Sequence, residues 1–136
     1  MIPRPPSAAA LAVLVVPLAQ GPGSPPPATG DLIFQGACAT CHAPGSPRVL
    51  AGQKLLGETP AISGDDPTRA IRLILRGRQP AAEQRGAWMP GFAPVLSDQQ
   101  IADVLQWLRT SSGHLPWPGL ADRVHAIRTE GQGVGQ

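Results

Sequence analysis

Apolar residues recur at the spacing of an α-helix in three stretches of this chain, and the clearest of them is the last. After Ser97, apolar side chains fall at every third or fourth position, which places them on one face of a helix. Ser97 and Gln100 have the spacing of an N-terminal capping box, and Gly113 is expected to end the helix. The apolar positions of this face are Ile101, Val104, Leu105 and Leu108.

Two shorter helices are predicted earlier in the chain. Asp66 is a suitable cap and Pro67 a suitable first helical residue, while Gly77 is expected to end this helix. The stretch DLIFQGACATC, residues 31–41, suits a first helix that ends at the cysteines. No stretch alternates with the period of a β-strand over a useful length. We therefore expect an all-α domain with three core helices and long ordered loops.

The N-terminal part of the chain has the pattern of an export signal. Arg4 precedes an apolar run over 8–19, which is followed by a polar, proline-rich stretch. We interpret residues 1–19 as a signal peptide and residues 20–29 as a flexible linker, which predicts a periplasmic location. The apolar run is too short for an ordinary membrane span of roughly twenty residues, although an uncleaved signal would still tether the domain.

Composition limits the rest of the chain to one domain that is rich in loops. The 136 residues include 17 prolines and 16 glycines, which break the apolar stretches into short pieces. The net charge of +2 is spread out and the chain has no tyrosine, so nucleic-acid binding is not expected. On the helix after Pro67, Arg69, Arg72 and Arg76 share one face, which is either a solvated face or a docking patch for an acidic partner.

Both cysteines lie in one short motif that carries candidate chemistry. The sequence Cys-Ala-Thr-Cys-His over residues 38–42 has the C-x-x-C-H spacing of covalent c-type haem attachment. Cys38 and Cys41 reach the two vinyl groups of the haem, and His42 is thereby delivered to the iron as the proximal ligand. A zinc site would need a second pair of ligands, and a thioredoxin-like redox pair would need a βαβ setting. The sequence offers neither, and we predict one haem c.

The sixth iron ligand is predicted by elimination. The chain has two methionines, and Met1 belongs to the signal segment. Met89 lies in the loop Trp-Met-Pro-Gly-Phe, where proline and glycine prevent a regular helix and a stiff loop can present sulfur to the iron. The alternatives are that Met89 only fills the core, or that His114 or His125 binds the iron. We predict Met89 as the ligand.

This pair of ligands indicates what the site does. His42 and Met89 together leave the iron no open position, and a thioether ligand raises its reduction potential. We therefore expect a carrier of single electrons and not an enzyme; a haem enzyme or gas sensor is the alternative. Apolar residues are expected to pack on the haem, so that the apoprotein folds poorly. They are Phe34, Leu50, Ile71, Ile74, Leu75, Trp88, Phe92 and Trp107.

With the haem motif, the methionine loop and the capped last helix together, residues 30–113 resemble the class I cytochromes c. The resemblance implies a cytochrome c domain over this range, with three core helices around one haem. It also implies that Gly30 and Phe34 on the first helix pack against Trp107 on the last. A proline after the haem motif, here Pro47, is implied to offer its carbonyl to the N–H of the proximal histidine.

Three further stretches, which begin at Leu56, Met89 and Leu115, are similar to cytochrome domains paired with periplasmic molybdenum hydroxylases of the nicotinate and isoquinoline dehydrogenase type. This resemblance implies a subunit that takes electrons from a molybdenum and iron–sulfur enzyme and passes them toward the respiratory chain. Related domains also serve alcohol and aldehyde dehydrogenases. The alternative is a diffusible cytochrome that moves between respiratory complexes.

The residues after Gly113 are expected to distinguish a dedicated dehydrogenase subunit from a diffusible cytochrome. We interpret residues 114–136 as a C-terminal extension that docks on the partner through Trp117, Leu120 and Val124. On this interpretation the extension is dispensable for haem binding.

Overall fold

A computed structural model of the chain describes residues 1, 29–50, 52, 54–80 and 88–130. The predicted signal peptide and linker over 2–28 lie outside the described residues. The described part is helical: α1 Thr29–Ala37, α2 Ala39–His42, α3 Pro47–Leu50, the 3-10 helix η1 Leu56–Glu58, α4 Pro60–Ser63, α5 Thr68–Arg76, α6 Asp98–Ser111 and α7 Leu120–Thr129. Its only β-type pairing is one isolated antiparallel bridge between Arg78 and Met89.

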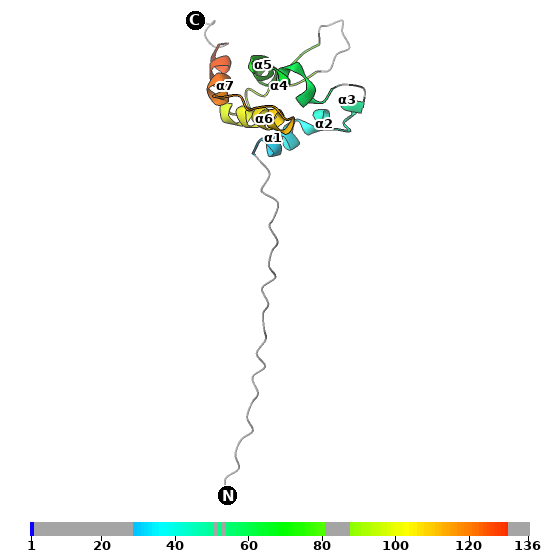
Figure 1. The fold of residues 1–136 in the computed structure, drawn as a ribbon, viewed down its shortest axis with the longest axis vertical. Helices are drawn as coiled ribbons and strands as arrows, with labels where there is room; N and C mark the ends of the chain where they lie inside the picture. Colours follow the sequence, from blue (N-terminus) through cyan, green and yellow to red (C-terminus); the bar gives the residue numbers. More distant parts are fainter. Residues whose placement is uncertain (2–28, 51, 53, 81–87, 131–136) are drawn as a thin grey trace.

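Helix α6 is the central element, and α1, α4, α5 and α7 pack around it (Figure 1). Its start is the predicted capping box: the Ser97 hydroxyl accepts from the Gln100 amide at 3.2 Å, and the Gln100 side chain accepts from the Ser97 amide at 2.9 Å. Ile101, Val104 and Leu105 on its apolar face are almost completely buried. The prediction for this helix is therefore confirmed.

The crossing of α1 and α6 is as close as the resemblance implied. A methyl group at Gly30 would lie 2.6 Å from the Cβ of Trp107 and would overlap the backbone of Asp103. One turn later, the rings of Phe34 and Trp107 are 4.9 Å apart between centroids and tilted by 39°. Only glycine fits at position 30, because any Cβ there would push the two helices apart.

Helix α5 is found where the sequence predicts it, with a start one residue later. Pro67 is the N-cap rather than the first helical residue, and the Asp66 carboxylate accepts hydrogen bonds from the amide and hydroxyl of Thr68 at 3.2 and 2.8 Å. The helix ends at Gly77, whose φ of 72° is a left-handed conformation that favours glycine.

The largest departure from the sequence analysis is a further helix, α7, which belongs to the core. Trp117, Leu120 and Val124 are 3%, 4% and 0% exposed, and α7 packs on α6 and α5. The prediction that these three side chains dock on a partner is therefore wrong. Their helical spacing is that of an amphipathic face, and the chain buries this face itself.

A buried arginine joins the segment before α7 to the rest of the molecule. The guanidinium of Arg109 donates to the carbonyls of Ile62 and Gly64 at 2.6 and 2.7 Å and also to the carbonyl of Leu115. Its carbon lies 4.2 Å from the centroid of the Trp117 ring. Arg109 thereby ties the end of α4 to the segment before α7, and the indole of Trp117 supports this link by donating to the Gly64 carbonyl at 3.2 Å.

Candidate functional site

The haem-type motif forms a single helical turn. Cys38 is the N-cap of α2, and its carbonyl accepts from the amides of Cys41 and His42 at 3.1 and 3.0 Å. The Ser46 hydroxyl donates to the Cys41 carbonyl at 2.8 Å and so fixes the exit of the turn. Both cysteines are free thiols and are half-buried. In this geometry, side chains three and four residues apart share one side of the turn.

The turn opens on a cavity of about 350 Å³. Cys38 and His42 lie on its wall, and so does Met89 from the segment before α6. Cys41 is not among the lining residues. The apolar part of the wall is supplied mainly by η1, α4, α5 and α6: Leu56, Ala61, Ile62, Ala70, Leu73, Ile74, Val104, Leu105 and Leu108. The fold therefore brings together three of the four residues that the sequence analysis assigned to the haem.

The Met89 segment is held against the C-terminal end of α5. Met89 and Arg78 exchange two backbone hydrogen bonds of 2.9 Å, and the amide of Phe92 donates to the carbonyl of Ile74 at 2.8 Å. The two glycines at this contact leave no room for a side chain, since a Cβ on Gly77 would lie 2.6 Å from the amide nitrogen of Gly91. This close approach is the reason that both positions are glycine.

The charged residues on the cavity wall are all cationic among those that the structure describes: Arg48, Lys54, Arg69 and Arg78. The guanidinium of Arg48 donates to the carbonyl of Trp88 at 2.8 Å, which links α3 to the residue before Met89. An apolar wall with a cationic margin suits an apolar macrocycle that carries two carboxylates, as haem does.

The shifted pKa of His42 also suits a ligand of iron. Burial, and after it the charge of Arg48, lowers the pKa of His42 below its ordinary value. The imidazole is therefore neutral at physiological pH and can offer a lone pair to a metal ion. Burial, with Cys41 as the second cause, raises the pKa of the Cys38 thiol.

Most of the other residues that were predicted to pack on the haem do not line the described wall of the cavity. Ile74 lines the cavity, while Ile71 and Leu75 lie in the core. Pro47, Trp88 and Phe92 are absent from the described wall, and the side chain of Trp88 is 56% exposed. The structure gives no contact of the Pro47 carbonyl with His42. The side chain of Leu50 lies outside what the structure describes.

The alternative histidine ligands do not reach the cavity. His114 and His125 are absent from its described wall, and His125 instead pairs with Asp98 at 2.9 Å. Within the described ranges, no three side chains of the types His, Cys, Asp and Glu come together in a group that could hold a metal ion.

The four cationic side chains of the described cavity wall, here called the cationic margin, were mostly not predicted from the sequence. Arg48 and Lys54 lie in the stretch after the motif, which has no helical periodicity to orient them. Arg69 was assigned to an arginine face of α5, and the structure divides that face: Arg69 lies on the cavity wall, while Arg72 pairs with Glu130 at 3.1 Å. Only the packing of α3 and α5 around the cavity decides which arginine faces it.

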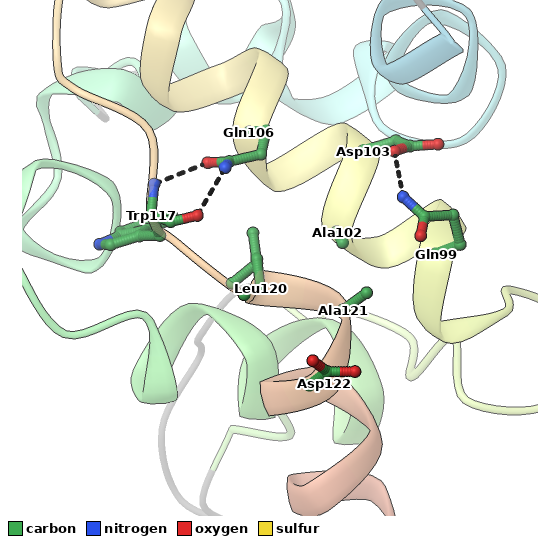
Figure 2. Close-up of a pocket in the computed structure, with 9 residues that line it drawn as sticks. Gln99, Ala102, Asp103, Gln106, Trp117, Leu120, Ala121 and Asp122 are labelled. Carbon is green, nitrogen blue, oxygen red and sulfur yellow. Dashed lines mark hydrogen bonds between the residues drawn. The ribbon is translucent and has the colours of Figure 1, made fainter.

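A second, smaller cavity of about 230 Å³ lies between α6 and α7 (Figure 2). On its wall, Gln106 makes two hydrogen bonds with the backbone of Trp117, at 2.7 and 3.0 Å. Gln99 and Asp103 pair on its α6 side at 2.8 Å. None of the four predicted haem residues lines this cavity, so it is separate from the site above.

In the part of the chain that the structure describes, no helix has the length and apolar character needed to cross a membrane.

Comparison with known proteins gives one family and several curated relatives. The family model described as cytochrome c matches residues 27–112. One of the subunits of nicotinate dehydrogenase from Pseudomonas putida is 34% identical over 107 residues, which cover 73% of this chain and 9% of that protein. The gluconate 2-dehydrogenase cytochrome c subunit of Pantoea cypripedii is 33% identical over 90 residues, covering 63% of this chain and 20% of the relative.

The cytochrome c subunit of the quinone alcohol dehydrogenase of Gluconobacter oxydans is 31% identical over 109 residues, which cover 77% of this chain and 23% of the relative. The chain thus spans less than a quarter of each of these three proteins. Helix α7 lies beyond the residues that the family model matches.

Proposed function

The chain belongs to the cytochrome c family, in which haem c is the cofactor, and we propose that Cys38 and Cys41 attach the haem while His42 and Met89 bind its iron. One observation carries the assignment of Cys38, His42 and Met89: the fold brings them to the wall of one cavity. Cys41 is assigned on the spacing of the motif alone. When bound there, haem supplies one-electron oxidation and reduction.

The chain's own residues support the proposal that the site transfers electrons rather than catalysing a reaction. With haem bound, His42 and Met89 would both be ligands of its iron and would leave no position for oxygen or a substrate. The apolar wall from α5 and α6 would keep water from a bound haem, and Arg48, Lys54, Arg69 and Arg78 would offset its carboxylates. A haem enzyme or gas sensor would need a ligand that leaves easily.

For the partner, we propose an exported dehydrogenase with molybdenum and iron–sulfur centres as the electron donor and a respiratory-chain component as the acceptor. The similarity to a component of nicotinate dehydrogenase supports this donor. A second candidate, a gluconate or quinone alcohol dehydrogenase, is supported by the other two relatives. The proposed location is the periplasm, on the export-signal pattern of residues 1–19.

The iron ligand is tested by Met89→His. We expect the reduction potential to fall, because a nitrogen donor favours ferric iron more than a thioether does. Potentiometric titration of the purified holoprotein measures it, and Leu115→His, at a position 82% exposed and away from the Met89 segment, is the control that should leave the potential unchanged.

Met89→Ala should go further and allow the reduced protein to bind carbon monoxide, which we expect the parent protein to resist. An unchanged potential in Met89→His together with no carbon monoxide binding in Met89→Ala would overturn the assignment. The sixth ligand of the iron would then be a residue other than Met89.

The partner is tested by reconstitution. The oxidised cytochrome is mixed with a molybdenum hydroxylase of the same organism and the substrate of that enzyme, and haem reduction is followed by absorption. We expect reduction that requires both proteins and the substrate, and a rate that falls with ionic strength if the cationic margin guides docking. Faster reduction by a quinone alcohol dehydrogenase run in parallel would favour the second candidate.

A further inference from the structure

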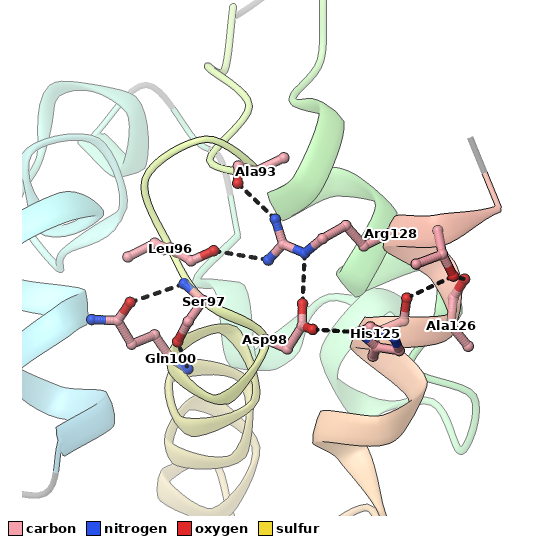
Figure 3. Close-up of polar contacts among 9 residues, drawn as sticks. Ala93, Leu96, Ser97, Asp98, Gln100, His125, Ala126 and Arg128 are labelled. Carbon is pink, nitrogen blue, oxygen red and sulfur yellow. Dashed lines mark hydrogen bonds and ion pairs between the residues drawn. The ribbon is translucent and has the colours of Figure 1, made fainter. Parts of the chain in front are cut away.

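Helix α7 lies outside the family match, yet it makes direct contact with the segment that carries Met89. The contact is made by Arg128, near the end of the helix (Figure 3). We propose that Arg128 is a positioning residue that holds the turn over residues 93–96 in place and thereby keeps Met89 at the haem cavity. The proposal rests on Met89 being the iron ligand, as proposed above.

The geometry of Arg128 is that of a clamp on backbone carbonyls. Its two terminal nitrogens donate to the carbonyls of Ala93 and Leu96 at 2.6 and 2.8 Å. Its Nε donates to Oδ1 of Asp98 at 2.6 Å, and Oδ2 of Asp98 pairs with Nδ1 of His125 at 2.9 Å. A planar guanidinium can hold three such acceptors at once, which a lysine ammonium on a flexible stem cannot do with the same geometry.

Backbone hydrogen bonds of 2.8–2.9 Å hold Met89 and Phe92 at the end of α5. The clamp acts on the turn that follows them, over residues 93–96, which α5 holds less tightly. Between Met89 and α6 the chain has no regular helix, and the amides of Val95 and Leu96 turn back on the carbonyl of Phe92. The bond from the Ala93 amide to the Leu75 carbonyl, at 3.3 Å, is long. Arg128 binds this turn from the side of α7, so the turn is held between α5 and α7.

Burial distinguishes this contact from an ordinary surface ion pair. The side chains of Arg128 and Asp98 are only 19% and 27% exposed. Hydrogen bonds to charged groups in such surroundings stabilise a fold more than exposed pairs do, which contribute little. Arg123, five residues earlier on α7, forms an exposed pair with Asp66 at 2.6 Å and has no bond to the 93–96 turn among the described contacts.

These two arginines provide a matched experiment on the intact holoprotein. Arg128→Gln and Arg123→Gln are compared with the parent protein by three readouts: the sulfur-to-iron charge-transfer absorption of the ferric form, the reduction potential, and the rate of carbon monoxide association with the reduced form. For Arg128→Gln we expect loss of part of the absorption, a lower potential and carbon monoxide association about tenfold faster, the factor for loss of one charge-assisted hydrogen bond. Arg123→Gln should match the parent protein in all three.

A general loss of stability is separated from loosening of Met89 by measuring urea unfolding of both variants. If Arg128→Gln fails to give folded holoprotein, Arg128→Lys carries the test, because it keeps the charge and loses the clamp geometry. Parent-like absorption, potential and carbon monoxide rate in the folded Arg128 variant would overturn the proposal. Absence of the sulfur-to-iron absorption in the parent protein would overturn it together with the ligand assignment, so the two failures are distinguishable.

Discussion

The two cysteines sit on one helical turn, and only Cys38 lies on the described cavity wall. Each thioether is nevertheless expected to be needed, because the core has a cavity that the chain cannot close alone. We expect Cys38→Ala and Cys41→Ala each to lower or abolish the amount of mature holoprotein, measured by haem content after purification. Thr40→Ala, between them and exposed, is the control that should keep normal levels. Normal levels of both cysteine variants with unchanged haem would argue against covalent attachment.

Asp98 makes the folded chain less stable at acid pH than at neutral pH. Burial alone would raise its pKa, but hydrogen bonds from Arg128 and His125 outweigh burial and lower the pKa below its ordinary value. Folding therefore favours the charged form. The stabilisation is complete above the unfolded-state pKa of about 3.9 and is lost as the pH falls through the lower folded-state value.

The corresponding prediction concerns Asp98→Asn. We expect it to cost about 1–3 kcal/mol of unfolding free energy near neutral pH, because charge-assisted bonds are lost, and progressively less as the pH falls below about 4. Urea denaturation at a series of pH values measures both effects. Asp122→Asn, an exposed change of the same kind on α7, is the control. A cost that is the same at acid and neutral pH would contradict the assigned role of the charge.

At the scale of the elements, the crossing of α1 and α6 depends on the missing side chain of Gly30. We expect Gly30→Ala to lower the unfolding free energy of the holoprotein by about 1–3 kcal/mol, because the new methyl group overlaps Asp103 and Trp107. Gly36 offers a control on the same helix, since no atom lies within 4 Å of a Cβ built there. Gly36→Ala should be neutral or stabilise the helix by up to about 1 kcal/mol. Equal effects of the two changes in denaturant titrations would show that the crossing has room to adjust.

At the scale of the whole molecule, α7 is part of the fold and not an appendage. Removing residues 114–136 would take away four buried side chains, Trp117, Leu120, Val124 and Ile127. At about 1.5–3 kcal/mol each, the loss is on the order of 6–12 kcal/mol, comparable with the stability of a whole domain. We expect the truncated chain to give little folded holoprotein, as judged by haem content and circular dichroism.

Single substitutions separate this effect from damage caused by truncation. Leu120→Ala, at a position 4% exposed, should cost about 2–5 kcal/mol. Leu115→Ala, at a position 82% exposed in the same segment, should stay within about 0.5 kcal/mol of the parent protein. If the truncated protein kept the haem spectrum and stability of the parent protein, residues 114–136 would not be needed for folding and this prediction would be wrong.

Several parts of this molecule could be predicted from the sequence because they depend on neighbours in the chain. The capping box of Ser97 and Gln100, the stop at Gly77 and the turn that joins Cys38 to His42 each involve residues a few positions apart. Local hydrogen bonds and backbone preferences determine such features wherever the segment later packs. The haem motif is local in the same sense, and together with the methionine loop and the capped last helix it carries the resemblance to the class I cytochromes c.

Other parts were decided only by the tertiary structure. The sequence marks an apolar face from Trp117 to Val124, but it does not say whether a partner or the chain itself covers that face. Likewise, nothing local selects Arg69 over Arg72 for the cavity wall, or joins Arg128 to the turn before α6. Burial, ion pairs and the cavity wall all arise from contacts between residues distant in the chain, and these contacts exist only once the helices have packed.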